Sequence, residues 1–241
     1  MHKFDRIVNE VIAKSDILLL IIDARRVEGS INKYLEKKLE RENKKFIYVI
    51  NKCDLISEEE QRKIKMKNSI QVSAKEHLST MKLLRKIMAL GRGEKVKVGV
   101  IGYPNTGKST LINSLKGKHS AMTSSTSGFT KGTQKVRISQ NIVLMDTPGV
   151  IPYEDKKQVD SLIIGSIDAN KVKDPEGAAI QLIEELDGKI EDYYQVEKSE
   201  DTEETLEKIA IKKNILKKGK EPDTARMGKE IIMLWQKGKI T

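Results

Sequence analysis

Gly102-Tyr103-Pro104-Asn105-Thr106-Gly107-Lys108-Ser109 is the stretch of this 241-residue chain that decides its fold class. An apolar segment at 95–101 precedes it, and a helical pattern at 108–115 follows it. The spacing G-x-x-x-x-G-K-S between a strand and a helix is typical of phosphate-binding loops, in which backbone N–H groups surround a phosphate. We therefore expect an α/β fold, with a mostly parallel sheet flanked by helices and this loop at the carboxyl end of a strand.

The side chains of this loop have distinct expected roles. Lys108 would act as the catalytic cation on the β- and γ-phosphates, and the Ser109 hydroxyl would bind Mg²⁺. Asp146, at the end of a later apolar segment, is expected to hold the Mg²⁺ through a water, and the N–H of Gly149 to sense the γ-phosphate during catalysis. The residues expected to line the phosphates are Asn105, Thr106, Gly107, Lys108, Ser109, Thr110 and Gly149.

Two shorter motifs earlier in the chain predict which base is bound. Asn51-Lys52-Cys53-Asp54 follows an apolar segment at 46–50, and Ser73-Ala74-Lys75 follows a short predicted strand at 69–72. The Asp54 carboxylate can accept two hydrogen bonds from the N1–H and N2 amino group of guanine, which adenine cannot supply, so a site built around it rejects adenine. We expect GTP and GDP as ligands, with the base side of the site formed by Asn51, Lys52, Asp54, Ser73, Ala74 and Lys75.

The order of these motifs is unusual. In the ordinary linear order of a GTPase the phosphate loop comes first, whereas here both base motifs precede it. We expect Gly91-Arg92-Gly93-Glu94 to be the linker that joins the ordinary ends of the domain. The permutation also moves the covalent exit of the domain to just after the segment that senses the γ-phosphate, so whatever follows residue 150 is tied to hydrolysis.

Hydrophobic periodicity predicts the remaining elements. It predicts further helices at 4–14, 30–42, 57–67 and 78–90, and further strands at 17–23, 135–139 and 142–145. Beyond about residue 155 only helices are predicted, at 176–186, 203–213 and 223–236, the last of them capped by Asp223 and carrying Trp235 on its apolar side. We predict a circularly permuted GTPase domain at 1–152 and a small all-α domain at 153–241.

The net charge of +10 is distributed unevenly along the chain. Residues 1–150 hold 29 basic and 15 acidic side chains, residues 151–207 hold 6 and 17, and residues 208–241 hold 10 and 3. The surplus in the first segment exceeds what one nucleotide requires, and the Lys cluster at 212–220 adds a second basic patch, so RNA is the expected large partner. The alternative is a Lys-rich solvated surface with ion-pair networks of the kind found in thermophile proteins.

Composition argues against several other classes of protein. The longest apolar run, 17–22, has six residues, far short of the roughly 20 that span a bilayer, and the charged N-terminus lacks the apolar region of a signal peptide. We therefore expect a cytoplasmic location. The single cysteine, Cys53, excludes a disulfide framework within the chain, and the three scattered histidines predict no zinc site.

The order of motifs resembles that of the circularly permuted YlqF/YawG GTPases, which assist assembly of the large ribosomal subunit. Besides the guanine motif, the residues that carry the resemblance are Ser15-Asp16, Asp23-Ala24-Arg25, the run from Pro104 to Asn113, and Gly128-Phe129-Thr130-Lys131-Gly132-Thr133-Gln134 as the first switch. At the C-terminus, 219–223 and 235–240 resemble the nucleolar and archaeal-type members. The resemblance covers nearly the whole chain.

This resemblance implies further roles. Thr130 would be the switch threonine that completes Mg²⁺ coordination when the γ-phosphate is present, with Thr133 as the competing candidate. Val150 stands where many GTPases place the glutamine that orients the attacking water, which implies slow intrinsic hydrolysis stimulated by ribosomal particles. Asn105 would help to hold a potassium ion in the place of an arginine finger. Alternatively, Asn105 only shapes the loop.

The expected function is that of a GTPase which hydrolyses GTP to GDP and phosphate as a switch in large-subunit assembly, binding rRNA in its GTP state. No membrane or DNA partner is expected, and no oligomer is required. Two alternatives remain open. One is a regulatory GTPase that acts on a protein partner, and the other is a nucleotide-gated RNA-binding module with negligible hydrolysis.

Overall fold

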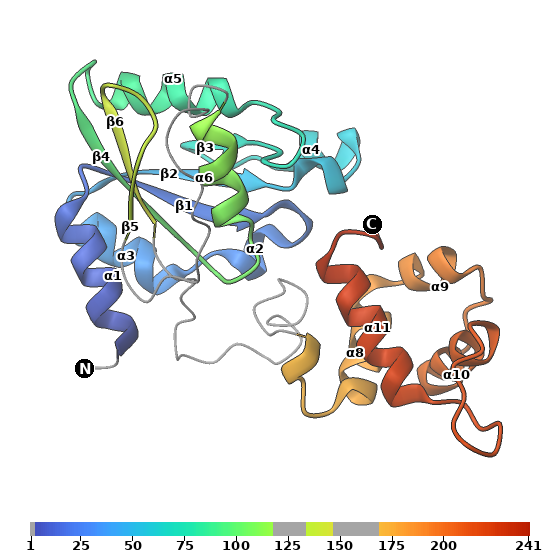
Figure 1. Ribbon diagram of the computed structural model, residues 1–241. Coiled ribbons are helices and arrows are strands. Elements are labelled where there is room, and N and C mark those ends of the chain that lie inside the picture. The colour runs from blue at the N-terminus through green and yellow to red at the C-terminus, as the bar shows by residue number, and fades with distance from the viewer. Residues whose placement is uncertain (1–2, 118–133, 147–168) are drawn as a thin grey trace. The chain divides into compact units, whose positions relative to one another are not determined.

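The computed structural model describes residues 3–117, 134–146 and 169–241. The chain divides into two compact units, Met1–Tyr153 and Glu154–Thr241, each of which has its own core (Figure 1). The predicted domain boundary, between residues 152 and 153, lies outside the described residues. None of the helices in the described ranges is both long enough and apolar enough to cross a membrane.

A six-stranded sheet forms the centre of the first unit, with strand order β3-β2-β1-β4-β6-β5. The neighbouring pairs are parallel except β5 and β6, which are antiparallel. The strands are β1 (Ile17–Asp23), β2 (Lys45–Asn51), β3 (Ser69–Gln71), β4 (Val96–Gly102), β5 (Gln134–Arg137) and β6 (Ile142–Asp146). The prediction of a mostly parallel sheet is therefore confirmed.

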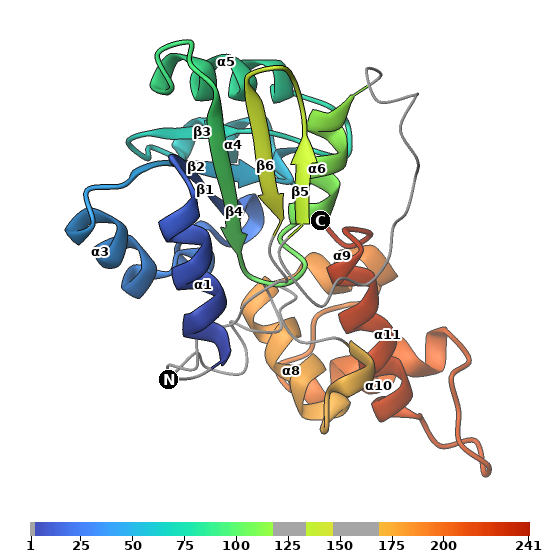
Figure 2. The ribbon, with the colours of Figure 1, turned by 60° about the vertical axis from the view of Figure 1, so that its left-hand side comes forward.

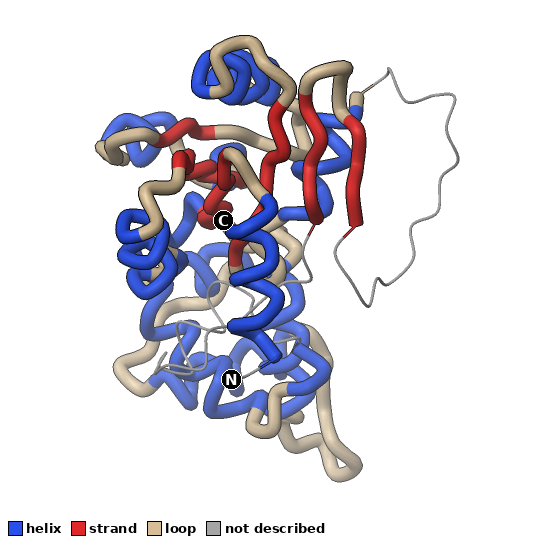
Figure 3. The backbone as a smooth tube through the Cα atoms, turned by 90° about the vertical axis from the view of Figure 1, so that its left-hand side faces the viewer, coloured by secondary structure: helices blue, strands red, loops and turns tan. Residues whose placement is uncertain are grey.

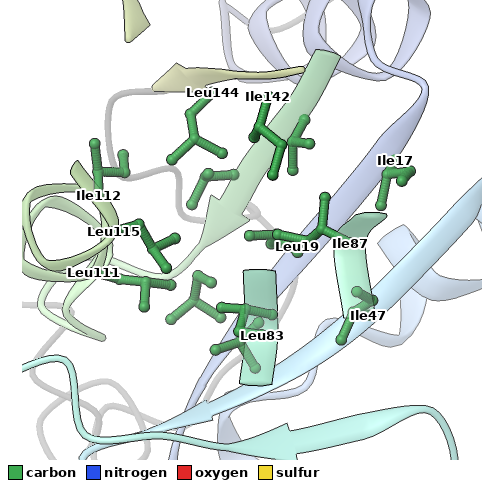
Figure 4. Packing of buried hydrophobic residues seen from close by; sticks show 14 of the residues in the cluster. Ile17, Leu19, Ile47, Leu83, Ile87, Leu111, Ile112, Leu115, Ile142 and Leu144 are labelled. Atoms are coloured by element: carbon green, nitrogen blue, oxygen red, sulfur yellow. The ribbon is translucent and has the colours of Figure 1, made fainter. Parts of the chain in front are cut away.

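Helices cover both faces of this sheet, as Figures 1 and 2 show. On one face α5 (Thr80–Leu90) and α6 (Lys108–Lys116) bury Leu83, Ile87 and Leu111 against the strands (Figure 4). On the other face lie α1 (Lys3–Lys14) and α3 (Lys33–Arg41). Because both faces are covered, β1 can be apolar at successive positions: alternate side chains enter opposite cores.

In the sheet, whose strands are red in Figure 3, the phosphate-loop strand β4 lies between β1 and β6 (Figure 2). It is reached from α5 through the predicted linker Gly91-Arg92-Gly93-Glu94, which forms a tight turn in which Gly93 has a φ of +78°. Gly91 N–H closes the helix by donating to the Ile87 carbonyl oxygen at 2.9 Å. The phosphate loop therefore follows the carboxyl end of a central strand and leads into α6, as predicted.

Three predicted helices of the first unit differ from the observed ones. The helix predicted at 30–42 is two helices, α2 (Val27–Ser30) and α3, because the Asn32 side chain accepts a hydrogen bond from Leu35 N–H and starts a new helix. The helix predicted at 57–67 is the shorter α4 (Glu58–Lys63), since the chain is already extended at Ile64. Helix α5 starts at Thr80 instead of residue 78, because Leu78 forms a backbone bridge with Ser73.

The second unit is helical in its described part, as predicted. It consists of the short 3₁₀ helix η4 (Ala169–Lys171) followed by α8 (Pro175–Leu186), α9 (Lys189–Tyr194), α10 (Thr202–Lys212) and α11 (Thr224–Gln236). Trp235 is buried at 1% exposure among aliphatic side chains, and Asp223 caps α11 by accepting from Arg226 N–H, so both predictions are confirmed. Helix α9 was not predicted, because its six residues are too few to show a helical period.

Candidate nucleotide-binding site

The predicted motifs converge at the carboxyl edge of the sheet. Asp23, the last residue of β1, pairs in register with Asn51, the last residue of β2. Gly102, the last residue of β4, pairs with Ile21 two positions before the end of β1. In a parallel sheet such ends face one edge, where ligands of open α/β folds bind. The guanine motif and the phosphate loop therefore begin at the same edge of the sheet, on either side of β1.

Asn51 connects the three loops of the site. Its side chain is buried, and the Nδ2 amide donates to the Thr106 carbonyl oxygen at 2.9 Å. Its Oδ1 atom accepts from Ala74 N–H at 3.0 Å. These partners lie 55 and 23 residues away in sequence. One amide thus fixes the guanine motif against both the phosphate loop and the Ser73-Ala74-Lys75 loop.

The phosphate loop adopts the backbone of an anion-binding nest. Asn105 and Gly107 both have left-handed φ angles, of +59° and +91°. A Cβ atom on Gly107 would lie 2.2 Å from Asn51 Nδ2, and one on Gly102 would lie 2.7 Å from the Ile21 carbonyl oxygen. Successive N–H groups in such a turn point into one concavity, which suits phosphate oxygens. Glycine is required at both positions because a side chain would collide with the adjoining strands.

Lys108, the first residue of α6, is buried inside this loop. Its ammonium group donates to the Gly102 carbonyl oxygen at 2.9 Å and to the Tyr103 carbonyl oxygen. The loop therefore holds a cation at the amino end of a helix whose first N–H groups also carry partial positive charge. Ser109 and Thr110 follow in the first helical turn and are exposed.

Lys52 and Asp54 of the guanine motif flank a tight turn. Lys52 has a left-handed φ of +65° and precedes the short 3₁₀ helix η2 (Cys53–Leu55), which contains Asp54. Lys52 is partly buried, and its ammonium group donates to Asp23 Oδ2 at 2.7 Å. Burial lowers the pKa of Lys52, while the negative charge of Asp23 opposes this change.

Asp23 forms a buried ion cluster with Lys52 and Arg25. The carboxylate has no exposed surface, and it accepts from Arg25 Nε at 3.0 Å, from an Arg25 terminal nitrogen at 2.9 Å and from Arg25 N–H at 3.1 Å. Burial alone would raise the pKa of this carboxyl, but the hydrogen bonds and charge of Arg25, and then of Lys52, outweigh burial and hold the pKa below its ordinary value. Asp23 therefore stays ionised and anchors the side chain of Lys52.

The Ser73-Ala74-Lys75 loop is held by its backbone. Ser73 is fully buried, its Oγ accepts from Glu76 N–H at 3.1 Å, and its backbone exchanges two hydrogen bonds with Leu78. Lys75 is exposed, with its ammonium group 3.4 Å from the Glu76 carboxylate. Ala74 N–H is already donated to Asn51, so this loop positions the guanine motif through main-chain contacts.

Two protein-family models match this chain. The model described as RsgA GTPase matches residues 2–154, and the model described as 50S ribosome-binding GTPase matches residues 97–219. Each match covers more than half of the chain, and the base motifs lie before the phosphate loop in sequence but beside it in space. The chain belongs to the circularly permuted GTPases of the YlqF/YawG type.

Individual relatives agree with this assignment. An uncharacterized GTP-binding protein of Methanocaldococcus jannaschii is 41% identical over 98% of this chain, which covers 65% of that protein. Nucleolar GTP-binding protein 2 of Saccharomyces cerevisiae is 34% identical over 98% of this chain, which covers 52% of that protein. GNP-bound YlqF from T. maritima has the same fold, with a TM-score of 0.68 and 24% identity over 99% of this chain and 95% of that chain. The GTPase thus spans between about half and 65% of the length of these curated relatives.

Several predicted residues of this GTPase lie outside the described residues. They are Thr130, its competitor Thr133, Gly149 and Val150. The backbone of Asp146 ends β6, which runs parallel to β4, so its Cα lies at the same edge of the sheet as the phosphate loop. Among the residues that the structure describes, no cluster of His, Cys, Asp and Glu could hold a metal ion by itself.

Sequence reasoning assigned no role to Asp23 and Arg25 of this GTPase. They appeared only within Asp23-Ala24-Arg25, as part of the family resemblance. A signal was present, because an acidic residue directly after a run of apolar strand residues must lie at the carboxyl edge of the sheet. The partner of that carboxylate, Lys52, is 29 residues away, and the strand pairing of β1 with β2 was needed to identify it.

Proposed function

We propose that this GTPase hydrolyses GTP to GDP and phosphate as a switch in assembly of the large ribosomal subunit, and that it binds rRNA in its GTP state. The observation that carries the nucleotide part is the pair of hydrogen bonds made by Asn51. They bring together a motif suited to guanine and a loop suited to phosphate, and a guanine nucleotide contains both groups.

In this proposal one side of the site binds the guanine base and the other side binds the phosphates. Asp54 accepts hydrogen bonds from the guanine edge, while Asn51, Lys52 and the Ser73-Ala74-Lys75 loop hold the walls of the base pocket. The phosphate side consists of the loop residues from Asn105 to Thr110, together with Gly149. Lys108 contributes its charge to the β- and γ-phosphates, where negative charge develops as the bond to the γ-phosphate breaks.

The residues present suit a magnesium ion. Ser109 offers a hydroxyl oxygen in the first turn of α6, and Asp146 ends the strand beside β4. Together with Thr130, they would supply the hydroxyl and carboxylate oxygens that Mg²⁺ prefers, with Asp146 acting through a water. When bound, Mg²⁺ would neutralise charge on the phosphates.

Two alternative roles are proposed for Asn105. In one, its side chain helps to hold a potassium ion beside the phosphates. In the other, it only shapes the loop, and its left-handed φ of +59° supports this version because asparagine adopts that conformation more readily than most residues. Hydrolysis rates in potassium and sodium buffers, compared between the wild type and Asn105→Ala, distinguish the two versions.

The ribosomal part of the proposal rests on similarity and charge. The matching family is described as a 50S ribosome-binding GTPase, and the S. cerevisiae relative is named a nucleolar GTP-binding protein. The surplus of basic side chains in residues 1–150 suits a polyanionic partner. We further propose a GTPase domain at 1–152 joined to a helical RNA-contacting domain at 153–241, and a cytoplasmic location.

Co-sedimentation with large ribosomal subunits tests the proposal. Binding should be seen with a non-hydrolysable GTP analogue in potassium buffer and should be much weaker with GDP. Failure to bind in both states, despite tight nucleotide binding, would contradict a ribosomal role and would favour a regulatory GTPase with a protein partner.

Hydrolysis needs a separate measurement. Because Val150 replaces the water-orienting glutamine, we expect slow turnover by the protein alone and faster turnover when ribosomal particles are added. Absence of turnover even with particles and potassium would favour a nucleotide-gated RNA-binding module.

A further inference from the structure

The outer face of α5 is basic and contains no acidic side chain. Leu83 and Ile87, on the inner face, have no exposed surface and pack against the sheet. Lys82 and Arg85 are exposed on the outer face, and Arg92 is exposed in the turn that follows the helix. We call Lys82, Arg85 and Arg92 the α5 basic face.

In some helices of the molecule, cations form ion pairs one turn away. In α4, Arg62 lies 3.0 Å from Glu58 and Lys63 lies 2.7 Å from Glu59. Helices α1 and α10 contain similar pairs. Within the described residues, none of the three side chains of the α5 basic face contacts a carboxylate. An ordinary solvated Lys-rich surface accounts for α4 but leaves the missing acids of α5 unexplained.

The spacing of these cations suits an extended polyanion. At about 1.5 Å of rise per helical residue, Lys82 lies about 12 Å along the helix from its last residue, Leu90, and Arg92 follows in the turn beyond it. A phosphodiester backbone presents negative charges repeatedly over such a length, and its affinity grows with each counterion that a lysine or arginine displaces. Leu78 and Met81, at 52% and 62% exposure, add only a small apolar contact at one end of the helix. Charge complementarity therefore favours RNA over a protein surface.

The α5 basic face is fixed to the rigid part of the first unit. Just before the helix, Leu78 exchanges two backbone hydrogen bonds with Ser73 of the Ser73-Ala74-Lys75 loop, here called the base loop. In the first turn, Leu83 N–H donates to the Ser79 carbonyl oxygen. Lys86 donates to the Ser69 carbonyl oxygen at 3.1 Å, and Lys45 donates to the Leu90 carbonyl oxygen at 3.0 Å. The elements that hold α5 thus belong to the sheet and the base loop and are independent of the γ-phosphate.

We infer that the α5 basic face is a binding surface for the phosphate backbone of RNA and that it contributes equally in the GTP and GDP states. The inference rests on the proposed function, which supplies RNA as the partner. It separates two contributions to RNA binding. The α5 basic face anchors the protein in both nucleotide states, and the segments that sense the γ-phosphate control the difference between them.

The test uses the full chain and two variants that lose the same charge. The first is Lys82→Gln/Arg85→Gln/Arg92→Gln, and the matched control is Arg62→Gln/Lys63→Gln/Lys65→Gln, in and after α4, where the substituted side chains are also exposed. The probe is a fluorescently labelled RNA hairpin, titrated over a series of salt concentrations with a GTP analogue and with GDP. Equal guanine-nucleotide affinity of all three proteins shows that the first unit has folded.

We expect the α5 variant to bind the hairpin at least about tenfold more weakly, and its salt slope to fall by about 2 to 3, because each phosphate contact contributes about 0.7 to 0.9 to that slope. Both changes should be the same with either nucleotide, and the α4 control should bind like the wild type. Equal losses in the two variants would overturn the inference while leaving the proposed function intact. So would a loss that is confined to one nucleotide state.

A wild-type protein that does not bind the RNA hairpin also gives a clear result. If the wild type binds large ribosomal subunits but not the hairpin, the α5 basic face does not bind RNA phosphates and the inference is wrong. If the wild type binds neither, the proposed function itself is wrong.

Discussion

The two units differ in where they bury polar side chains. In the described part of the first unit nine polar residues are buried, and five of them lie at or just beyond the carboxyl edge of the sheet: Asp23, Asn51, Ser73, Thr106 and Lys108. The second unit buries Glu191, Thr205 and Thr224. Polar groups are costly to bury unless they are hydrogen-bonded, so their concentration at one edge marks the place where the fold serves a ligand.

The buried threonines of the second unit serve its helices. Thr224 donates to Glu176 Oε1 at 2.8 Å, which ties the start of α11 to that of α8, and Thr205 accepts from Ser199 N–H at 3.2 Å. Lys212, Lys213, Lys217, Lys218 and Lys220 are exposed at the surface of this unit. The comparison indicates that the ligand-binding site lies in the first unit, whereas the second unit is suited to contacts made by its surface. RNA contact by the lysine cluster stays a proposal.

Asp23→Asn should have the largest effect. It removes the charge of the buried carboxylate that pairs with Arg25 and Lys52, and breaking a buried ion pair in this way costs about 3–5 kcal/mol of folding free energy. Guanine-nucleotide affinity should fall as well, because Lys52 loses its anchor. Calorimetry and nucleotide titration measure the two effects, and Asp16→Asn, at the exposed amino end of β1, is the matched control.

The same variant predicts a pH dependence. Because the folded-state pKa of Asp23 is lowered, its ionised form stabilises the fold at pH values above the ordinary aspartate pKa, and this stabilisation is lost as the pH falls through the lowered pKa. The difference in unfolding free energy between wild type and Asp23→Asn should be full at neutral pH and shrink in acid. A difference that stays constant with pH would show that Asp23 acts only through packing.

Trp235→Ala tests the apolar core of the second unit. Removing a buried tryptophan side chain costs about 3–5 kcal/mol, so amide hydrogen exchange should accelerate in α8, α10 and α11. Lys229→Ala, on the exposed side of α11, is the control. Guanine-nucleotide affinity should not change. A loss of nucleotide affinity in Trp235→Ala would show that the core of the second unit also affects the nucleotide site of the first.

Gly107→Ala should weaken nucleotide binding by about tenfold or more, because left-handed backbone costs a non-glycine residue about 1–2 kcal/mol and the new Cβ also displaces Asn51. Gly188→Ala is a matched control, since Gly188 has the same φ of +91° but no atom within 4 Å of the added Cβ. Nucleotide titration and thermal unfolding of both variants separate backbone strain from the collision. If Gly107→Ala and Gly188→Ala lower the free energy of unfolding equally and neither weakens nucleotide binding, Gly107 is needed only for its left-handed backbone conformation.

Asp223→Ala should have the smallest effect. It removes the side chain that caps α11 and costs about 1 kcal/mol, whereas Asp223→Asn keeps the capping oxygen and should cost little. Amide hydrogen exchange in the first turn of α11 measures the difference. A nucleotide-dependent difference between the two variants would mean that the second unit responds to the site in the first.

Much of this molecule could be predicted from its sequence, because the main signals are local. The run 17–22 is apolar at every position, which predicts a strand covered on both faces, and the glycines of the phosphate loop stand where a close backbone approach requires them. Local signals were weakest where elements are short. The six residues of α9 and the break at Asn32 between α2 and α3 were missed for that reason.

The sequence by itself determined the permuted order of motifs, the strand and helix that flank the phosphate loop, and the helical character of the C-terminal part, since each depends on neighbouring residues and their period. The tertiary structure alone decided that Asn51 joins two loops and that Asp23 holds Lys52. It also decided that, among the described residues, no carboxylate contacts Lys82, Arg85 or Arg92. The physical reason is distance along the chain: these contacts depend on strand register and on which face of a helix is buried, and no local pattern encodes either of them.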